Sequence, residues 1–170
     1  MFNKQKTMSR IIIVLLGIFG ISPTALGQCM EKCPDGWTRF KDSCYFYGYE
    51  QSLNFIEATH YCQLHHAHLV TIENSVENAF VIDYLKKIKA GFTWIGLSDM
   101  DIEGVWRWYS NDMIAQFTDW APGQPGSENG EQDCGVIVTD HKWHDGTCND
   151  TYHPFCEKET TEMELGGIIG

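Results

Sequence analysis

The segment Trp94-Ile95-Gly96-Leu97 predicts a short apolar strand in a chain of 170 residues. Cysteines lie on both sides of this strand, at Cys33, Cys44, Cys62, Cys134, Cys148 and Cys156. The spacing of the cysteines alone permits many disulfide pairings. The strand and the series of cysteines together are compatible with few folds, and they allow the chain to be tested residue by residue.

The N-terminus has the pattern of a secretory signal peptide. Three basic residues precede the apolar run at 11–21, and small residues follow at Ala25-Leu26-Gly27. The alternative is a membrane anchor, since no charge lies between Arg10 and Glu31. A spanning helix needs about 20 predominantly apolar residues, however, and polar residues dilute the second half of this segment. We expect cleavage after residue 27, and hence a secreted, extracellular protein with no membrane insertion.

Loss of the signal peptide leaves nine Lys and Arg against 23 Asp and Glu, a formal net charge of −14. This charge argues against nucleic acid or an anionic membrane as a partner, and it suits the binding of cations. All seven cysteines remain in the mature chain, which predicts disulfides in a secreted protein. Asn149-Asp150-Thr151 is a candidate N-glycosylation site.

The first half of the chain predicts two helices. The aromatic-rich segment 37–47 is expected to be a strand or hairpin. Residues 52–63 predict a helix, with Phe55, Ala58, Thr59 and Cys62 on one face. A second helix is expected to begin with a capping-box-like pair, Asn74 and Glu77, and to present an apolar face made of Val76, Phe80 and the 79–84 region.

The second half predicts short strands and one long loop. The strands are expected at 92–97, 105–109, 134–139, 142–144 and 154–158. The loop at 119–133 is rich in Pro, Gly, Ser and Asn, and loops of this length in a compact domain are usually functional or disordered. The pattern is α+β. The tail at 159–170 is expected to be disordered.

The chain resembles the long-form C-type lectin domain over residues 33–158. The matching motifs occur in order: Cys33-Pro-Asp-Gly-Trp37 with Cys44, then Phe55, Ala58 and Cys62, then His68-Leu-Val-Thr-Ile72, then WIGL, Gln124-Pro125-Gly126, Asp133-Cys134, Trp143-His144-Asp145 and Phe155-Cys156-Glu157. The resemblance implies two helices, two small antiparallel sheets and a long loop that binds calcium and sugar. It also implies the disulfides Cys33–Cys44, Cys62–Cys156 and Cys134–Cys148. Cys29, in the N-terminal segment 28–32, is left over and offers a link to a homodimer.

The resemblance implies a sugar site in which one calcium ion and its ligands hold two sugar hydroxyls. The positions that match are Gln124, Gln132, His144 and Asp145, of which Gln124 and Asp145 would also hold the ion. The chain departs from the family at Gly126, which lacks a ligand side chain, at Gln132, which replaces Glu, and at His144, which replaces Asn. We expect this site to bind calcium more weakly than the family's usual site does. The alternative is a lectin fold whose sugar site no longer functions.

A second calcium site of the family is better preserved. Asp99 and Glu103 match its acidic positions after WIGL, and Asp133 precedes Cys134. Ser127 stands where Asp or Asn is usual. Three converging carboxylates repel one another, and a cation offsets that cost. The alternative is that these acids lie on a solvated loop of an acidic protein.

No motif for catalysis occurs in the chain, so we expect a binding protein and not an enzyme. His65, His66 and His68 lack a cysteine or carboxylate cluster and are interpreted as ordinary surface or core residues. We therefore predict a secreted lectin that depends on calcium to bind glycans of microbial or cell surfaces in innate immunity. The alternatives are a protein-interaction module that does not bind sugar and an acidic protein associated with extracellular matrix or mineral.

Overall fold

The computed structural model describes residues 32–126 and 130–160. The expected signal peptide at 1–27, Cys29, Ser127 and all but the first two residues of the expected C-terminal tail lie outside these ranges.

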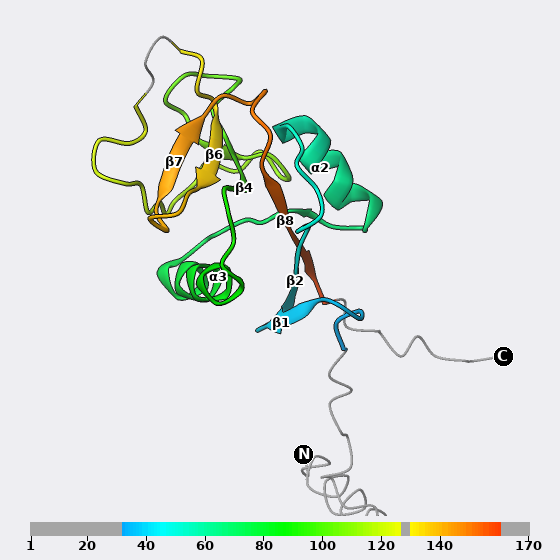
Figure 1. Cartoon of the computed structure of the whole chain (residues 1–170). Coiled ribbons are helices and arrows are strands. Elements are labelled where there is room, and N and C mark those ends of the chain that lie inside the picture. Colours follow the sequence, from blue (N-terminus) through cyan, green and yellow to red (C-terminus); the bar gives the residue numbers. More distant parts are fainter. Residues whose placement is uncertain (1–31, 127–129, 161–170) are drawn as a thin grey trace, which may run out of the picture. The chain divides into compact units, whose positions relative to one another are not determined.

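The described residues form two helices and eight short strands, and their arrangement (Figure 1) confirms the α+β class. In chain order they are β1 (Thr38–Phe40), β2 (Ser43–Tyr47), α2 (Phe55–Leu64), β3 (His68–Leu69), α3 (Ser75–Ile88), β4 (Thr93–Ser98), β5 (Arg107–Trp108), β6 (Cys134–Ile137), β7 (Trp143–Gly146) and β8 (His153–Glu159). β8 runs through the middle of the domain, between α2 and α3 (Figure 1). The strand expected at 105–109 is shorter than predicted.

The strands follow the order β1-β2-β8-β4-β6-β7, while β3 pairs with β8 and β5 pairs with β4. Among the strands that the structure describes, every pair is antiparallel except one, in which Thr93 and Trp94 of β4 lie parallel to His153 and Pro154 of β8. This short parallel pair joins the two small antiparallel sheets that were predicted. β8 can serve both sheets because it is long, with its first residues beside β4 and its later ones beside β2.

The first helix matches its prediction. Asn54 caps α2 by accepting a hydrogen bond from the Glu57 N–H, and the Glu57 carboxylate accepts one from the Asn54 N–H in return. The predicted face is buried, with Phe55, Ala58 and Cys62 fully inaccessible. The helix begins three residues later than expected, at Phe55, because the cap is Asn54.

The buried face of α3 matches its prediction in part, since Val81 is buried and Phe80 and Tyr84 pack against the core. Asn74 is the cap, as expected, but Val76 is 57% exposed. The buried residues are Glu77, Asn78, Val81 and Leu85. The two polar residues tolerate burial because they have partners: the Asn78 Oδ1 accepts a hydrogen bond from the Trp143 Nε1 at 3.0 Å, and Glu77 accepts from the hydroxyl of Tyr45.

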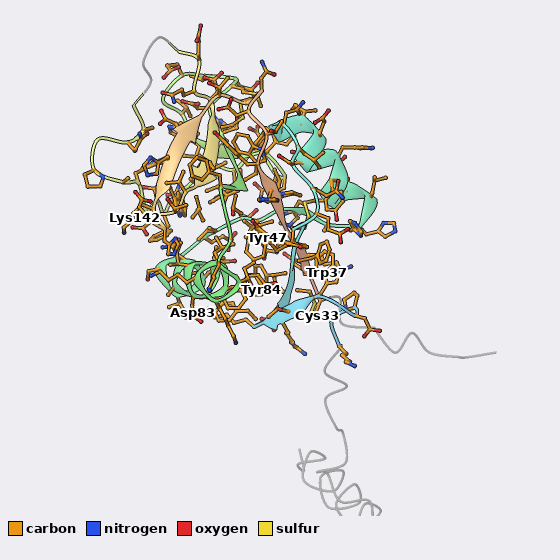
Figure 2. All side chains as sticks on the ribbon, in the orientation of Figure 1. Cys33, Trp37, Tyr47, Asp83, Tyr84 and Lys142 are labelled. Atoms are coloured by element: carbon orange, nitrogen blue, oxygen red, sulfur yellow. A yellow bond between two sulfur atoms is a disulfide. The ribbon has the colours of Figure 1, made fainter. Side chains whose placement is uncertain are left out.

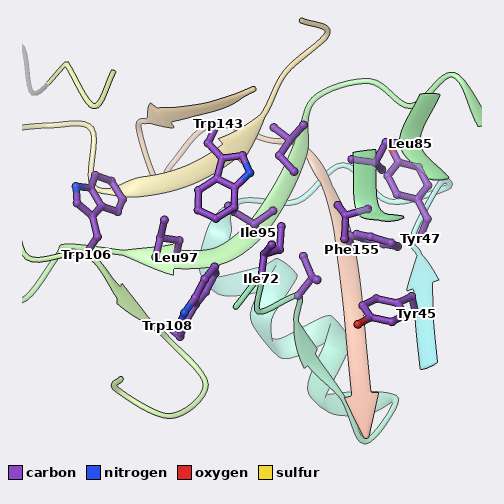
Figure 3. Close-up of a cluster of buried hydrophobic side chains, with 13 residues drawn as sticks. Tyr45, Tyr47, Ile72, Leu85, Ile95, Leu97, Trp106, Trp108, Trp143 and Phe155 are labelled. Carbon is purple, nitrogen blue, oxygen red and sulfur yellow. The ribbon is translucent and has the colours of Figure 1, made fainter. Parts of the chain in front are cut away.

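Aromatic side chains dominate the core (Figure 3). Trp94 and Trp143 are fully buried, and Trp106 and Trp108 are nearly so. Figure 3 shows Trp106, Trp108 and Trp143 in the larger of the two core clusters. Between α3 and β2, the rings of Tyr47 and Tyr84 (Figure 2) both pack on Phe155.

The WIGL segment is the buried centre of this core. Every residue of β4 is buried. Gly96 lies so close to the neighbouring chain that a Cβ there would stand 2.8 Å from the carbonyl oxygen of Leu69, nearer than real Cβ atoms come. A side chain at this position would therefore push β3 and β4 apart.

The three disulfides join Cys33 to Cys44, Cys62 to Cys156 and Cys134 to Cys148, which confirms the predicted pairing. The second bridge ties α2 to β8 across 94 positions of sequence, and the third ties β6 to the turn after β7. Regular pairing also continues past residue 158, the predicted end of the domain. Glu159 is in β8, and both the N–H and the hydroxyl of Thr160 donate hydrogen bonds to the Asp42 carbonyl.

Candidate functional site

The first residues of the long loop are held against β7 by hydrogen bonds. The Trp143 N–H donates to the Asp119 carbonyl at 3.1 Å, and the Ala121 N–H donates to the Trp143 carbonyl at 2.9 Å. The Asp119 carboxylate also receives hydrogen bonds from Lys142 and Asn78. These contacts fix where the loop leaves the sheet, and so they fix the positions of the residues that follow.

Gln124 and Asp145 lie side by side, one on the loop and one on β7. The Asp145 N–H donates to the Gln124 Oε1 at 3.4 Å, and the Gly126 N–H donates to the Asp145 Oδ2 at 2.7 Å. The Gln124–Pro125 peptide bond is cis. Asp145 is only 5% exposed. A carboxylate and an amide thus converge where the loop meets the strand. The carboxylate can only accept hydrogen bonds, whereas the amide can both donate and accept them.

Gly126 faces this pair of side chains. A Cβ at position 126 would lie 3.7 Å from the Gln124 Oε1 and 3.9 Å from the Asp145 Oδ1, both ordinary contact distances. A side chain here would therefore point between the two groups. Glycine therefore leaves this position without a third side-chain group beside Gln124 and Asp145.

His144 is engaged elsewhere. Its Nε2 lies 2.9 Å from the Asp140 Oδ2. Successive residues of a strand point to opposite faces, so the His144 and Asp145 side chains diverge. Burial alone would raise the pKa of Asp140, but hydrogen bonds from His144 and from the Lys142 N–H hold it below its usual value. Gln132 is half-buried, two residues before β6.

The predicted second site is built around Asp99, which is 3% exposed. Its Oδ2 accepts a hydrogen bond from the Gly104 N–H at 2.8 Å, while its Oδ1 has no hydrogen-bond partner among the described residues. Burial raises the pKa of Asp99, and the charges of Glu103 and Asp133 raise it further. Burial and the charge of Glu103 likewise raise the pKa of Asp133. The three predicted carboxylates therefore lie close enough to repel one another.

A buried carboxylate oxygen without a partner, in a mutually repelling group of acids, fits a hard cation such as calcium. Within residues 32–126 and 130–160, no three acidic, histidine or cysteine side chains already stand in a ligating arrangement. A bound ion would thus need backbone oxygens, water or movement of these side chains. Ser127, at the loop position of the second site, lies outside the described residues.

Sequence reasoning missed a second group of acids. A cavity of about 210 Å³ is lined by residues from β2, β3, β8, α3 and the segment before α3, among them Tyr45, His68, Thr71, Glu73, Glu77 and Glu157. The Tyr45 hydroxyl lies 2.8 Å from the Glu77 Oε1 and 3.2 Å from the Glu157 Oε1. A phenol has one proton, so it cannot donate to both carboxylates at once. The two glutamates are 80 positions apart, and Glu77 looked like a helix-cap residue, so no local signal joined them.

We expect Glu157→Gln to change how stability depends on pH. Burial and, less strongly, the charge of Glu77 raise the pKa of Glu157 above its usual value of 4.5. The stability that this carboxyl contributes is therefore complete below the unfolded pKa and is lost as pH rises through the folded pKa. Glutamine cannot ionise, so the variant should be more stable than the parent at pH 7, and the gain should disappear toward pH 4.

Urea unfolding at several pH values, in chelator so that no cation alters the cavity, measures this difference. Glu159→Gln, on the same strand but exposed, is the control and should show no such change. Parallel pH profiles for the parent and Glu157→Gln would contradict the expectation.

Two of the three neighbouring histidines make contacts within the domain. His65 packs among the rings of Trp37, Phe46 and Tyr61, and the His68 Nδ1 lies 2.8 Å from the Leu69 carbonyl.

Across the part of the chain that the structure describes, no helix is both long and apolar enough to cross a membrane.

Comparison with known proteins places this geometry in a family. The model of the lectin C-type domain matches residues 51–158. C-type lectin domain family 10 member A of Homo sapiens is 39% identical over 137 residues, covering 77% of this chain, and the match spans only 40% of the human protein. The perlucin-like protein of Mytilus galloprovincialis is 36% identical over 144 residues, covering 81% of this chain and 90% of that protein.

Among solved structures, the carbohydrate-recognition domain of the mouse scavenger receptor C-type lectin superposes with a TM-score of 0.70 at 27% identity. The superposition covers 76% of this chain and all of that domain. The family match, the two helices, the joined sheets and the three disulfides agree with one another, and the chain belongs to the C-type lectin domain family.

Proposed function

We propose that this chain is a lectin that binds carbohydrate at Gln124 and Asp145 with the help of calcium. The observation that carries the proposal is the convergence of these two residues, because the Gln124 Oε1 accepts a hydrogen bond from the Asp145 backbone N–H and the Asp145 carboxylate accepts one from the Gly126 N–H. Family membership supports it, because the mouse relative is named as a carbohydrate-recognition domain.

The chemistry of the pair suits sugar hydroxyls. The Asp145 carboxylate accepts hydrogen bonds, and the Gln124 amide both donates and accepts, so together they can hold two neighbouring hydroxyls in a fixed orientation. Calcium would be held by Gln124 and Asp145, and when bound it supplies a positive charge that attracts the lone pairs of the hydroxyl oxygens. Asp99, Glu103 and Asp133 would hold a second ion and order the loop. Gln132 stays a candidate contact, while His144 would first have to leave Asp140.

Export to the extracellular space is part of the proposal. Three disulfides within about 120 residues are typical of secreted domains and rare in reducing compartments. A single shallow sugar site binds weakly, so a homodimer joined through Cys29 would add avidity toward microbial or cell surfaces in innate immunity. Nothing in the family or the site suggests catalysis, so we propose that the protein is not an enzyme.

A protein-interaction module without sugar binding is the second candidate. It is favoured by Gly126, which leaves the site one ligand short, and by the contact that holds His144 away. Two measurements separate the candidates. For a lectin, free sugar should compete with binding and chelator should abolish binding, whereas neither should affect a protein-interaction module.

Calcium is expected to raise the melting temperature of the protein. An ion that binds only the native state stabilises it by about 2.7 kcal/mol at a concentration 100 times its Kd. Asp133→Asn should remove most of this shift, because it takes one carboxylate from the repelling group. Asp83→Asn, an exposed position on α3 (Figure 2), is the control and should keep the full shift. A melting curve that neither calcium nor chelator moves would contradict the proposal.

Gly126→Asp is expected to strengthen calcium and sugar binding by about tenfold, or 1.4 kcal/mol. A side chain at this position points between Gln124 and Asp145 at ordinary contact distance, so it adds an oxygen where the site lacks one. Isothermal titration at pH 7 measures the effect. Gly126→Ala adds the Cβ without the oxygen and should bind no better than the parent. Equal affinities for the Asp and Ala variants would show that the added oxygen does not reach the ion.

A further inference from the structure

The turn after β7 presents an asparagine in a setting unlike that of the other asparagines that the structure describes. The Asp150 N–H donates to the Thr147 carbonyl at 2.9 Å, which closes a turn with Cys148 and Asn149 at its centre. Asn149, Asp150 and Thr151 are all exposed. The Cys134–Cys148 disulfide anchors one side of this turn to β6.

Four other asparagines are described, and each uses its side chain in a hydrogen bond. Asn54 and Asn74 cap the two helices, Asn78 bridges Trp143 and Asp119, and the Asn111 Oδ1 accepts from the Met113 N–H. Among the described residues, no group forms a hydrogen bond with the Asn149 amide. Asn149 is also the one asparagine of the whole sequence that is followed, after one residue other than proline, by serine or threonine.

We propose that Asn149 carries an N-linked glycan. The inference rests on the proposed export of the chain, because the sugar donor is available only in the secretory pathway. The Asn149 Nδ2 forms a bond to C1 of the innermost sugar of a lipid-linked diphosphate oligosaccharide. The bond between C1 and the diphosphate oxygen breaks, the lipid diphosphate leaves with that electron pair, and the amide nitrogen loses one proton.

The folded domain accommodates the modification at no cost in packing. The Asn149 side chain is exposed and makes no described hydrogen bond, so a glycan displaces nothing. The backbone around it is held independently of the amide: the Phe55 N–H donates to the Cys148 carbonyl at 3.0 Å, and Leu53 and Tyr152 exchange backbone hydrogen bonds. The glycan would stand three residues beyond Gly146, the end of the strand that carries Asp145. Its bulk would therefore hinder other proteins from packing closely against this end of the domain.

Peptide mass spectrometry of the exported protein tests the proposal. The full chain is expressed in insect cells with its own N-terminus and, separately, with a heterologous leader fused in front of residue 1. Enzymatic removal of N-glycans in heavy-oxygen water converts a glycosylated asparagine to labelled aspartate. We expect the label at position 149 in the parent and in Thr151→Ser, which keeps the sequence signal. We expect none in Thr151→Ala or Asn149→Gln.

The leader fusion separates this proposal from that of export. A chain that leaves the cell only with the heterologous leader contradicts the proposed signal peptide but still tests Asn149. An exported, disulfide-bonded parent whose Asn149 is unmodified overturns the inference, whether or not that protein binds sugar. Label at position 149 in Thr151→Ala would overturn it as well, since the modification would then not depend on the hydroxyl residue.

Discussion

Replacing both Cys62 and Cys156 by alanine is expected to lower the free energy of unfolding by about 4–5 kcal/mol in the chain-entropy description of disulfides. The bridge closes a loop of 94 positions, and the entropy lost by the unfolded chain grows with loop length. Both cysteines are fully buried, where α2 packs on β8, so the bridge also lies within the packed core. A loss of this size is a large part of the stability of a typical domain.

The double variant Cys33→Ala with Cys44→Ala is the matched control. Its bridge spans only 11 positions, and the same description gives a loss of about 3 kcal/mol. Guanidinium unfolding of both variants, each with its remaining bridges intact, measures the difference. If the short-range variant were the less stable of the two, loop length would not be what makes the Cys62–Cys156 bridge important.

Asp145→Asn is expected to weaken sugar binding by at least about tenfold, a loss of 1.4 kcal/mol or more. Asp145 supplies the carboxylate of the pair with Gln124, and it is buried, so solvent cannot replace it. Asparagine keeps the size of the side chain but removes the charge that a cation and two hydroxyls would share. The thermal melt of the variant separates loss of binding from loss of folding, since the Gly126 N–H also donates to this carboxylate.

Asp140→Asn is the control for this prediction. Asp140 lies on the same hairpin, but its carboxylate is exposed and holds His144 and the Lys142 N–H. Its replacement should change sugar affinity by less than about twofold, or 0.4 kcal/mol. Equal losses for the two variants would mean that the site extends to His144, as the motif comparison had implied.

Local patterns predicted those parts of the fold that depend on neighbours in sequence. The buried face of α2 followed from the spacing of Phe55, Ala58 and Cys62, because apolar residues three and four apart share a helix face. On α3 the same reasoning found the apolar residues around Phe80 and Val81 but not the buried polar ones. The burial of Asn78 depends on Trp143 and Asp119, which come from distant segments. Hydrophobic spacing carries no information about a polar residue that is satisfied by a tertiary contact.

The candidate site shows the same division. The motifs located Gln124 and Asp145, and the structure brings them together. The direction of His144 depends on Asp140, four residues earlier, and on the alternation of side chains along β7. The sequence could not predict the group formed by Tyr45, Glu77 and Glu157, because these side chains come from β2, α3 and β8. Only the pairing of β2 with β8 and the packing of α3 bring them to one cavity.

Binding of the native protein to a glycan array, in calcium and in chelator, tests calcium-bridged sugar recognition most directly. Asp145→Asn and Asp140→Asn are run beside the parent under both conditions. The proposed function predicts that the parent and Asp140→Asn bind a set of glycans in calcium, that free sugar competes, and that chelator or Asp145→Asn removes the signal. Equal binding of the parent in calcium and in chelator, unaffected by Asp145→Asn, would contradict it.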